Sequence, residues 1–340
     1  MARWYSVRIV FGIYMAVVLL LLPVLALAAA DSDNALQAAQ QAMLKQRKML
    51  ALTDYMDGLV DQGVQALAAA LPELEQKAQQ DTQDAAAAFD LGTAYALLER
   101  FEDAIPVLTT AAELSPSAAA YYDLGLANYG LGLLDAALTA YKSAIRIDRD
   151  NGSIYYAMGC AYDDLAHYTE AVAAFKEAIR VDPEDEAAYY EMGSSLASQK
   201  NYADAITACQ TAVGLDPEDA EAYYLLGVSY HALDRYVEAA GAYQQAIHID
   251  PNYEVAYANL GNALNALQRY DEAVTACETA IGFDPQDPEA YYNLGRGYVG
   301  VGRVEEAIAA FQKYLELTPK DPYEDHATVE DIIQQLKNSK

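Results

Sequence analysis

Hydrophobic, small and polar positions recur along this chain with a period of 34 residues. Glycines keep this period from Gly125 to Gly295, and Gly92 stands one residue out of step before them. A Leu or Met directly precedes each of these seven glycines, and an Ala follows twelve residues after each. One period has room for two helices joined by a turn. The pattern therefore predicts an all-α chain of stacked helix pairs over residues 85–321. The seven units are expected at 85–117, 118–151, 152–185, 186–219, 220–253, 254–287 and 288–321.

The small residues of each unit have a common physical role. Gly or Ala at the point where two helices cross lets the backbones approach, so that large neighbouring side chains interlock. Asp-Pro pairs such as Asp216 and Pro217 end the second helix, because Pro cannot continue the hydrogen-bond ladder. The second unit departs from this rule, with Arg149 in the place of Pro.

The unit resembles a known repeat. The run Ala222 to Gly227, the run Tyr270 to Val274 and a closing Pro251 or Pro285 resemble the tetratricopeptide repeat, or TPR. The resemblance covers about seven tenths of the chain. It implies a right-handed α-solenoid of helix-turn-helix units whose work is to bind other proteins.

The residues before the array are less regular. Residues 31–84 are expected to form an N-terminal helical region, in which Gly58 and Ala70 keep the phase of the repeat. Residues 51–84 are thus either one degenerate eighth repeat or an irregular helical segment.

The residues after the array predict a cap. Residues 322–340 are expected to form a C-terminal capping helix that begins at a capping box of Thr328 and Asp331. Its apolar face would cover the open edge of the last repeat. That face consists of Val329, Ile332, Ile333 and Leu336.

The first thirty residues differ in composition from the rest. Two arginines precede an apolar stretch from Ile9 to Leu22, and small residues follow up to Ala30. This layout predicts a cleaved signal peptide over residues 1–30, and hence a periplasmic or secreted protein. The alternative is an uncleaved membrane anchor over residues 9–30, because the apolar stretch approaches the length that spans a bilayer.

Charge limits the kinds of partner. The chain carries 21 Lys and Arg against 50 Asp and Glu, a formal net charge of -29. Such a chain repels phosphate backbones, so nucleic acid is not an expected partner. The acidity fits either a soluble, repulsive surface or the attraction of a basic protein or peptide.

Catalytic and metal chemistry is not expected from the sequence. The four histidines have no His or Cys at helical spacing, so no metal or other cofactor is predicted. No nucleophile, acid and base are arranged for catalysis, and the chain is interpreted as a non-enzyme. Cys209 and Cys277 occupy a slot that other repeats fill with aromatic residues, which predicts buried thiols.

The candidate binding residues follow from the resemblance. In TPR proteins the first helix of each pair lines the concave groove, and here its fifth position is usually Tyr. A tyrosine there either binds a peptide or only supports its neighbours. The residues that this assigns to the groove are Tyr122, Tyr156, Tyr190, Tyr224 and Tyr292.

Polar residues that differ between repeats add to this groove. Asp163 and His231 mark its middle, and asparagine amides near its C-terminal end could hold a peptide backbone. The chaperone-binding members of the family clamp a terminal carboxylate with several basic residues, of which this chain has only one. The residues at the C-terminal end are Asn262, Asn265, Asn293 and Arg296.

These residues predict a scaffold that binds a peptide or helix of a partner protein in the concave groove. The alternative is a membrane-anchored structural adaptor of an envelope assembly, which would use other surfaces of the repeats.

Overall fold

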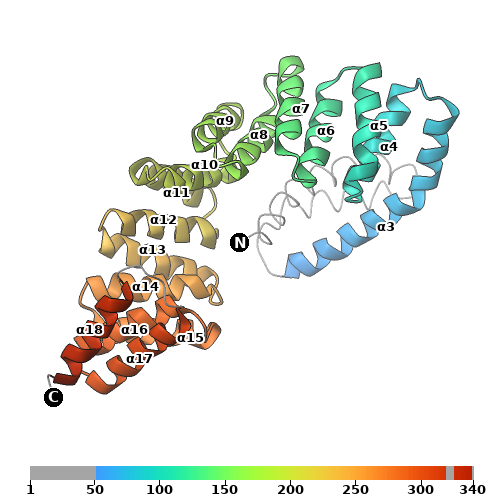
Figure 1. Ribbon diagram of the computed structural model, residues 1–340. Coiled ribbons are helices and arrows are strands. Elements are labelled where there is room, and N and C mark those ends of the chain that lie inside the picture. Colours follow the sequence, from blue (N-terminus) through green and yellow to red (C-terminus); the bar gives the residue numbers. More distant parts are fainter. Residues whose placement is uncertain (1–50, 319–324, 339–340) are drawn as a thin grey trace. The chain divides into compact units, whose positions relative to one another are not determined.

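The computed structural model describes residues 51–318 and 325–338, and Figure 1 shows them as coloured ribbons. This part of the chain contains sixteen helices and no strands, so the predicted all-α fold of stacked helix pairs is confirmed. The predictions for the signal or anchor of residues 1–30, and for residues 31–50, lie outside the described residues.

The helices fall into two compact units, Met1–Asp150 and Asn151–Lys340. The described helices of the first unit are α3 (Ala51–Gln80), α4 (Ala85–Leu97), α5 (Phe101–Leu114), α6 (Ala118–Gly130) and α7 (Leu134–Ile147). Those of the second are α8 (Gly152–Asp164), α9 (Tyr168–Val181), α10 (Glu186–Ser198), α11 (Tyr202–Leu215), α12 (Ala220–Ala232), α13 (Tyr236–Ile249), α14 (Glu254–Ala266), α15 (Tyr270–Phe283), α16 (Pro288–Gly300), α17 (Val304–Leu317) and α18 (Asp325–Asn338).

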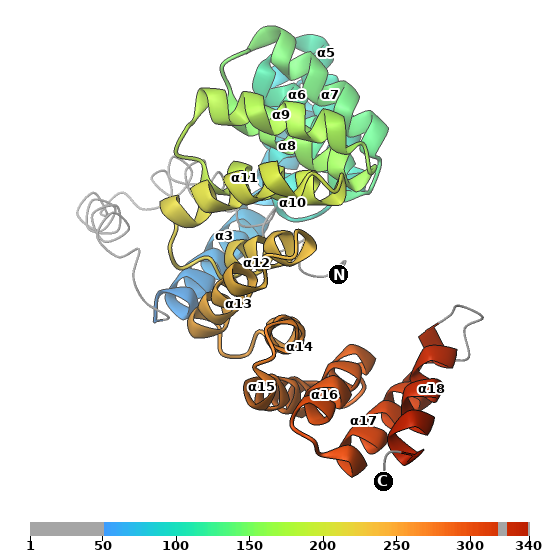
Figure 2. The same cartoon turned by 90° about the vertical axis from the view of Figure 1, so that its left-hand side faces the viewer.

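Each predicted repeat is a pair of helices in contact, and within a unit the second helix of one pair packs against the first helix of the next. Figure 2 shows this succession from α12 to α17. The pairs cross at the predicted glycines. A Cβ atom at Gly227 would lie 2.6 Å from the ring of Tyr243, and one at Gly261 would lie 2.3 Å from the sulfur of Cys277. Because glycine has no Cβ atom, the side chain of the second helix can pack directly against the backbone of the first helix.

On the side that faces the first helix, the second helices bury alanines and one larger residue per repeat. Ala239, Ala273 and Ala307 are fully buried, and so are Phe175 and Cys209. The predicted burial of Cys209 and Cys277 is confirmed, because both side chains are 0% exposed.

The turn inside each pair needs a residue in the left-handed region. Gly302 meets this need with φ of 77°, but Ala166 and Lys200 adopt φ of 57° and 61° without being glycine. Glu99, Asp234 and Gln268 do the same. The backbone hydrogen bond from His167 N to Tyr162 O, at 2.8 Å, closes one such turn. At these positions the backbone of a residue other than glycine is strained, because its Cβ atom disfavours a positive φ.

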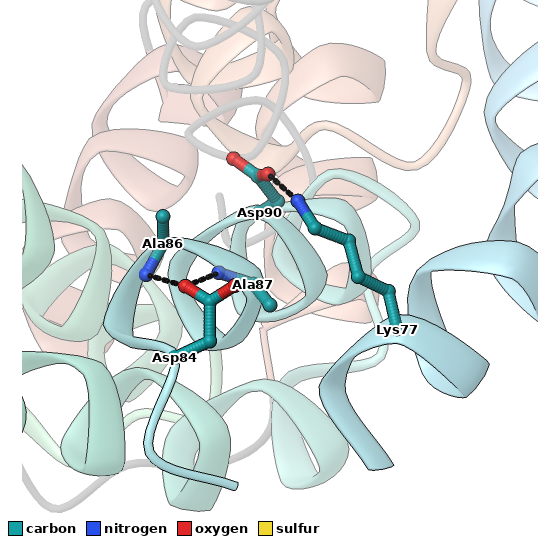
Figure 3. A network of polar contacts seen from close by, with 5 residues as sticks. All are labelled: Lys77, Asp84, Ala86, Ala87 and Asp90. Carbon is teal, nitrogen blue, oxygen red and sulfur yellow. Dashed lines mark hydrogen bonds and ion pairs between the residues drawn. The ribbon is translucent and has the colours of Figure 1, made fainter. Parts of the chain in front are cut away.

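Helix α3 packs on α4 as one uninterrupted helix rather than as a helix pair. Lys77 forms an ion pair of 3.4 Å with Asp90 of α4 (Figure 3). Asp84 caps α4, since its carboxylate accepts hydrogen bonds from the backbone N–H groups of Ala86 and Ala87 at 2.9 and 3.0 Å. Residues 51–80 thus lack the turn of a full repeat, although the C-terminal half of α3 contacts α4 as a second helix would.

The capping helix α18 lies on α17 and buries Val329 and Ile333 against it. The predicted starting point was wrong. The helix begins at Asp325, so Thr328 lies inside its first turns and is not the N-cap. His326 Nε2 lies 2.7 Å from Thr318 Oγ1 at the end of α17, a contact between residues that flank the connecting segment.

Candidate functional site

All eleven candidate residues lie on first helices. Tyr122 belongs to α6 in the first unit, whereas the other ten belong to α8, α10, α12, α14 and α16 in the second. The candidate site is therefore built on the first helices of the second unit, which we call the first-helix face.

The tyrosines of this face are half-buried, and Tyr156, Tyr224 and Tyr292 pack against rings of their own repeats. The ring centroids of Tyr156 and Phe175 lie 5.8 Å apart, and those of Tyr292 and Phe311 lie 5.9 Å apart. In both pairs the rings meet edge to face, a favourable aromatic geometry. These three tyrosines thus support the fold and still leave part of their surface to solvent.

Tyr224 has further partners that the sequence did not indicate. Its hydroxyl oxygen accepts a hydrogen bond of 3.0 Å from Asn259 Nδ2 of the next first helix. Its ring also lies 5.1 Å from that of Tyr253. Burial raises the pKa of Tyr224, and the bond from Asn259 opposes this shift. Asn259 follows Ala258, where the tyrosine row is broken, and it reaches back to the last tyrosine before the break.

Asp163 of α8 is joined to α10. Its carboxylate accepts a hydrogen bond from Ser195 Oγ, and Ser195 is fully buried. Burial raises the pKa of Asp163, whereas the bond from Ser195 lowers it. Glu191, 8% exposed, lies on the same helix as Ser195. Sequence reasoning missed Ser195, although its presence at a position that is usually Ala was a usable signal.

The four polar residues at the C-terminal end join α14 to α16. Arg296 Nη1 donates a 2.9 Å hydrogen bond to Asn262 Oδ1. Asn265 Nδ2 donates a 2.8 Å hydrogen bond to the backbone oxygen of Asn293. Asn265 and Asn293 are only 4% and 3% exposed. Their side chains therefore lie in the seam between the helices, not open to a ligand as expected, whereas Asn262 and Arg296 are half-buried.

His231 of α12 lies near this seam. Its ring meets that of Tyr236 at right angles, with centroids 5.2 Å apart. Burial lowers the pKa of His231, and the positive charge of Arg296 adds to that shift while Asp234 opposes it. Burial and Arg296 thus both favour the neutral form of the ring.

Among the described residues, no three His, Cys, Asp or Glu side chains are grouped so that they could hold a metal ion. Over the same residues, none of the helices combines the length and the apolar character that crossing a membrane requires.

Family comparisons match almost all of the helical array. A model described as "Tetratricopeptide repeat" matches residues 57–119, 89–152, 156–220 and 202–254. Further models with the description "Tetratricopeptide repeat" match 242–275 and 288–321, and one described as "TPR repeat" matches 261–300. A comparison with the curated proteins finds no match.

Solved structures share the fold. The C-terminal part of a TPR repeat-containing protein from Cytophaga hutchinsonii is 19% identical, with a TM-score of 0.60, and the match covers 72% of this chain and 98% of that one. YrrB, described as a TPR protein with an unusual peptide-binding site, is 22% identical with a TM-score of 0.52, over 58% of this chain and 99% of its own. MamA is 31% identical over 49% of this chain and 91% of its own, with a TM-score of 0.47.

Proposed function

Because the chain belongs to the tetratricopeptide repeat family, whose repeats generally mediate contacts between proteins, we propose that it is a non-catalytic scaffold that binds a peptide or helix of a partner protein. The proposed binding surface is the first-helix face of the second unit. The bound segment lies across α8, α10, α12, α14 and α16.

The observation that carries this proposal is a set of tyrosines whose rings are already packed against buried rings. Tyr156, Tyr224 and Tyr292 stand on alternate first helices, each packed on a buried ring of its second helix. A tyrosine that is already held in place loses little conformational freedom when a ligand covers its exposed part. Such a set of tyrosines favours the binding of an extended peptide segment over catalysis. YrrB is described as having a peptide-binding site, and we extend peptide binding to this chain as part of the proposal.

Library selection tests the proposal. Random dodecapeptides displayed on phage are selected against the purified protein, and enriched peptides are synthesised for affinity measurements. In the groove variant, Tyr156, Tyr190 and Tyr224 are each changed to Ala, and the dissociation constant should rise by about tenfold or more, as for the loss of aromatic anchors.

The chain provides a matched control on the same helices. In the control variant Tyr155, Tyr189 and Tyr223 are changed to Ala, which removes the same type of residue one position earlier on each helix. Circular dichroism and urea unfolding of both variants separate loss of binding from loss of fold. The proposal is wrong if the groove variant is folded and binds the enriched peptides as tightly as the unaltered protein does.

We also propose that residues 1–30 are a cleaved signal peptide, so that the scaffold works in the periplasm or outside the cell. The composition of these residues supports this location. The second candidate is a structural adaptor anchored by residues 9–30.

A further inference from the structure

Arg296 is the only Lys or Arg on any first helix of the seven repeats. The sequences of α4, α6, α8, α10, α12 and α14 contain neither residue, and α16 contains this one. On the first helices of the second unit, acidic residues include Asp163, Asp164 and Glu221. The single cation therefore stands out on a surface that otherwise carries negative charge.

The partner of Arg296 also sets it apart from the other arginines of the second unit. The other four each form an ion pair with a glutamate three residues away in the sequence, at 2.6 to 3.1 Å. These are Arg180, Arg235, Arg269 and Arg303. Among the described residues, the hydrogen bond of Arg296 goes to a neutral amide, Asn262, and no ion pair is formed. A half-buried cation without a countercharge is unfavourable unless another group neutralises it.

The guanidinium is held ready for such a group. It has five N–H donors in a planar fork, and the bond to Asn262 uses one of them. Asn265 lies about one turn after Asn262 on α14, and Asn293 lies about one turn before Arg296 on α16. The hydrogen bond from the Asn265 side chain to the backbone oxygen of Asn293 therefore holds α14 against α16. Two hydrogen bonds thus join the helices of the site before a ligand binds, which lowers the conformational entropy lost on binding.

We propose that Arg296, held by Asn262, binds the carboxylate of a Glu or Asp side chain in the peptide on the first-helix face. This inference rests on the proposed function. A guanidinium and a carboxylate form paired charge-assisted hydrogen bonds, and planar recognition of this kind favours Arg over Lys.

The surroundings of Arg296 select the position of that carboxylate. Elsewhere on the face, Asp163 and Asp164 repel acidic side chains. The preferred ligand is therefore neutral or basic opposite α8 and acidic opposite α16. Such a pattern fixes the register of the peptide on the face, because a shifted peptide loses one pairing and gains a repulsion.

The contact surface continues on both sides of Arg296. Tyr292 lies about one turn before it on α16, and Val299, which is 42% exposed, lies about one turn after it. Both residues lie along α16, so they flank the guanidinium on either side of a peptide that crosses the first helices. We place the carboxylate on a side chain inside the peptide and not at its C-terminal end.

The same type of library tests this inference, with the random segment flanked on both sides by Gly-Ser linkers. We expect one enriched acidic position. In an acetylated and amidated copy of an enriched peptide, replacing that Glu by Gln should weaken binding to the unaltered protein by about tenfold. In the Arg296→Gln variant the two peptides should bind equally. Arg296→Lys, which retains the charge, should keep a smaller preference for Glu.

Arg269→Gln is the matched control, because it makes the same change of charge at an arginine that is paired with Glu272 on a second helix. This variant should keep the full preference for Glu. Thermal unfolding of each variant checks that the fold is intact.

The outcomes separate the two proposals. If no enriched peptide depends on the groove tyrosines, the proposed function fails. If the peptides depend on those tyrosines but show no acidic preference, or keep it in Arg296→Gln, the proposed function stands and this inference fails. The inference also fails if only a free C-terminal carboxylate, compared with its amide, produces the Arg296-dependent gain.

Discussion

Tyr298 of α16 donates its hydroxyl to Glu278 Oε1 of α15 at 2.7 Å, and so joins two successive repeats. The guanidinium of Arg303 lies 4.4 Å from the centroid of the same ring. An equivalent bond of 2.9 Å joins Tyr95 to Glu75 in the first unit, where Arg100 takes the place over the ring. The recurrence of this arrangement in both units identifies it as a connection between a first helix and the helix before it.

Removing the Tyr298 hydroxyl should weaken that connection. Tyr298→Phe is expected to lower the free energy of unfolding by about 1 kcal/mol, because the side chain is buried and its carboxylate partner loses a donor. Urea unfolding measures the change. Tyr291→Phe is the control, since the Tyr291 hydroxyl makes only a 3.5 Å contact with Pro285 O. Equal effects of the two changes would contradict the role given to Glu278.

The left-handed turn residues predict opposite effects of two substitutions. Ala166→Gly should raise the free energy of unfolding by about 0.5 kcal/mol, because glycine adopts positive φ without steric strain. Gly302→Ala should lower it by about 1 kcal/mol for the same reason. Thermal or urea unfolding compares both variants with the unaltered protein. A stabilising effect of Gly302→Ala would refute this account of the turn.

Asp123 predicts a pH dependence of stability. Burial raises the pKa of Asp123 from 3.8 to about 6, and the 2.6 Å hydrogen bond from Thr93 Oγ1 opposes this shift. The folded protein thus holds this proton more tightly than the unfolded chain does. The resulting contribution to stability is complete below the unfolded pKa and is lost as the pH rises through about 6.

Asp123→Asn should remove this contribution. The free energy of unfolding of the variant, relative to that of the unaltered protein, is expected to rise as the pH increases from about 4 to about 6. Urea unfolding at a series of pH values gives the comparison. Thr93→Val should enlarge the dependence of the otherwise unaltered protein, since the ionised carboxylate loses its donor. A difference between Asp123→Asn and the unaltered protein that does not vary with pH would show that the shift is absent.

The buried cysteines should resist alkylation in the folded protein. Burial raises the pKa of the Cys209 and Cys277 thiols to about 12, and neither side chain is exposed. The reactive thiolate is therefore both scarce and shielded. Iodoacetamide should label these residues only after urea unfolding, as peptide mass spectrometry would show. Rapid labelling of either cysteine in the native protein would mean that its helix pair opens readily.

The N-terminal proposal depends on Trp4, the only tryptophan of the chain. Cleavage near Ala30 should leave a protein without tryptophan emission and with an intact mass that lacks residues 1 to about 30. An anchored protein should keep both the full mass and Trp4, a side chain favoured at membrane interfaces. Fluorescence and intact mass of protein from its native host distinguish the two. Full-length protein with tryptophan emission would favour the adaptor.

The regular part of the fold was predictable because its signals are local and repeated. Gly227 and Ala239 recur at the same phase in every repeat, and in the structure they mark the helix crossing and a fully buried position. The cap was less predictable. Its apolar residues Val329 and Ile333 were correctly placed inward, but a capping sequence at Thr328 did not determine where the helix begins.

By itself, the sequence determined the helix pairs, the residues at their crossings and the burial of Cys209 and Cys277, since a 34-residue period repeats the same short-range packing seven times. Only the tertiary structure decided which polar residues are open and which are enclosed. Asn265 is buried and Asn262 is half-buried although both lie on α14, because α16 covers one and only partly covers the other. The bond between Asp163 and Ser195 likewise depends on how two successive first helices pack. Contacts between repeats depend on the differences between them, and a shared period does not encode those differences.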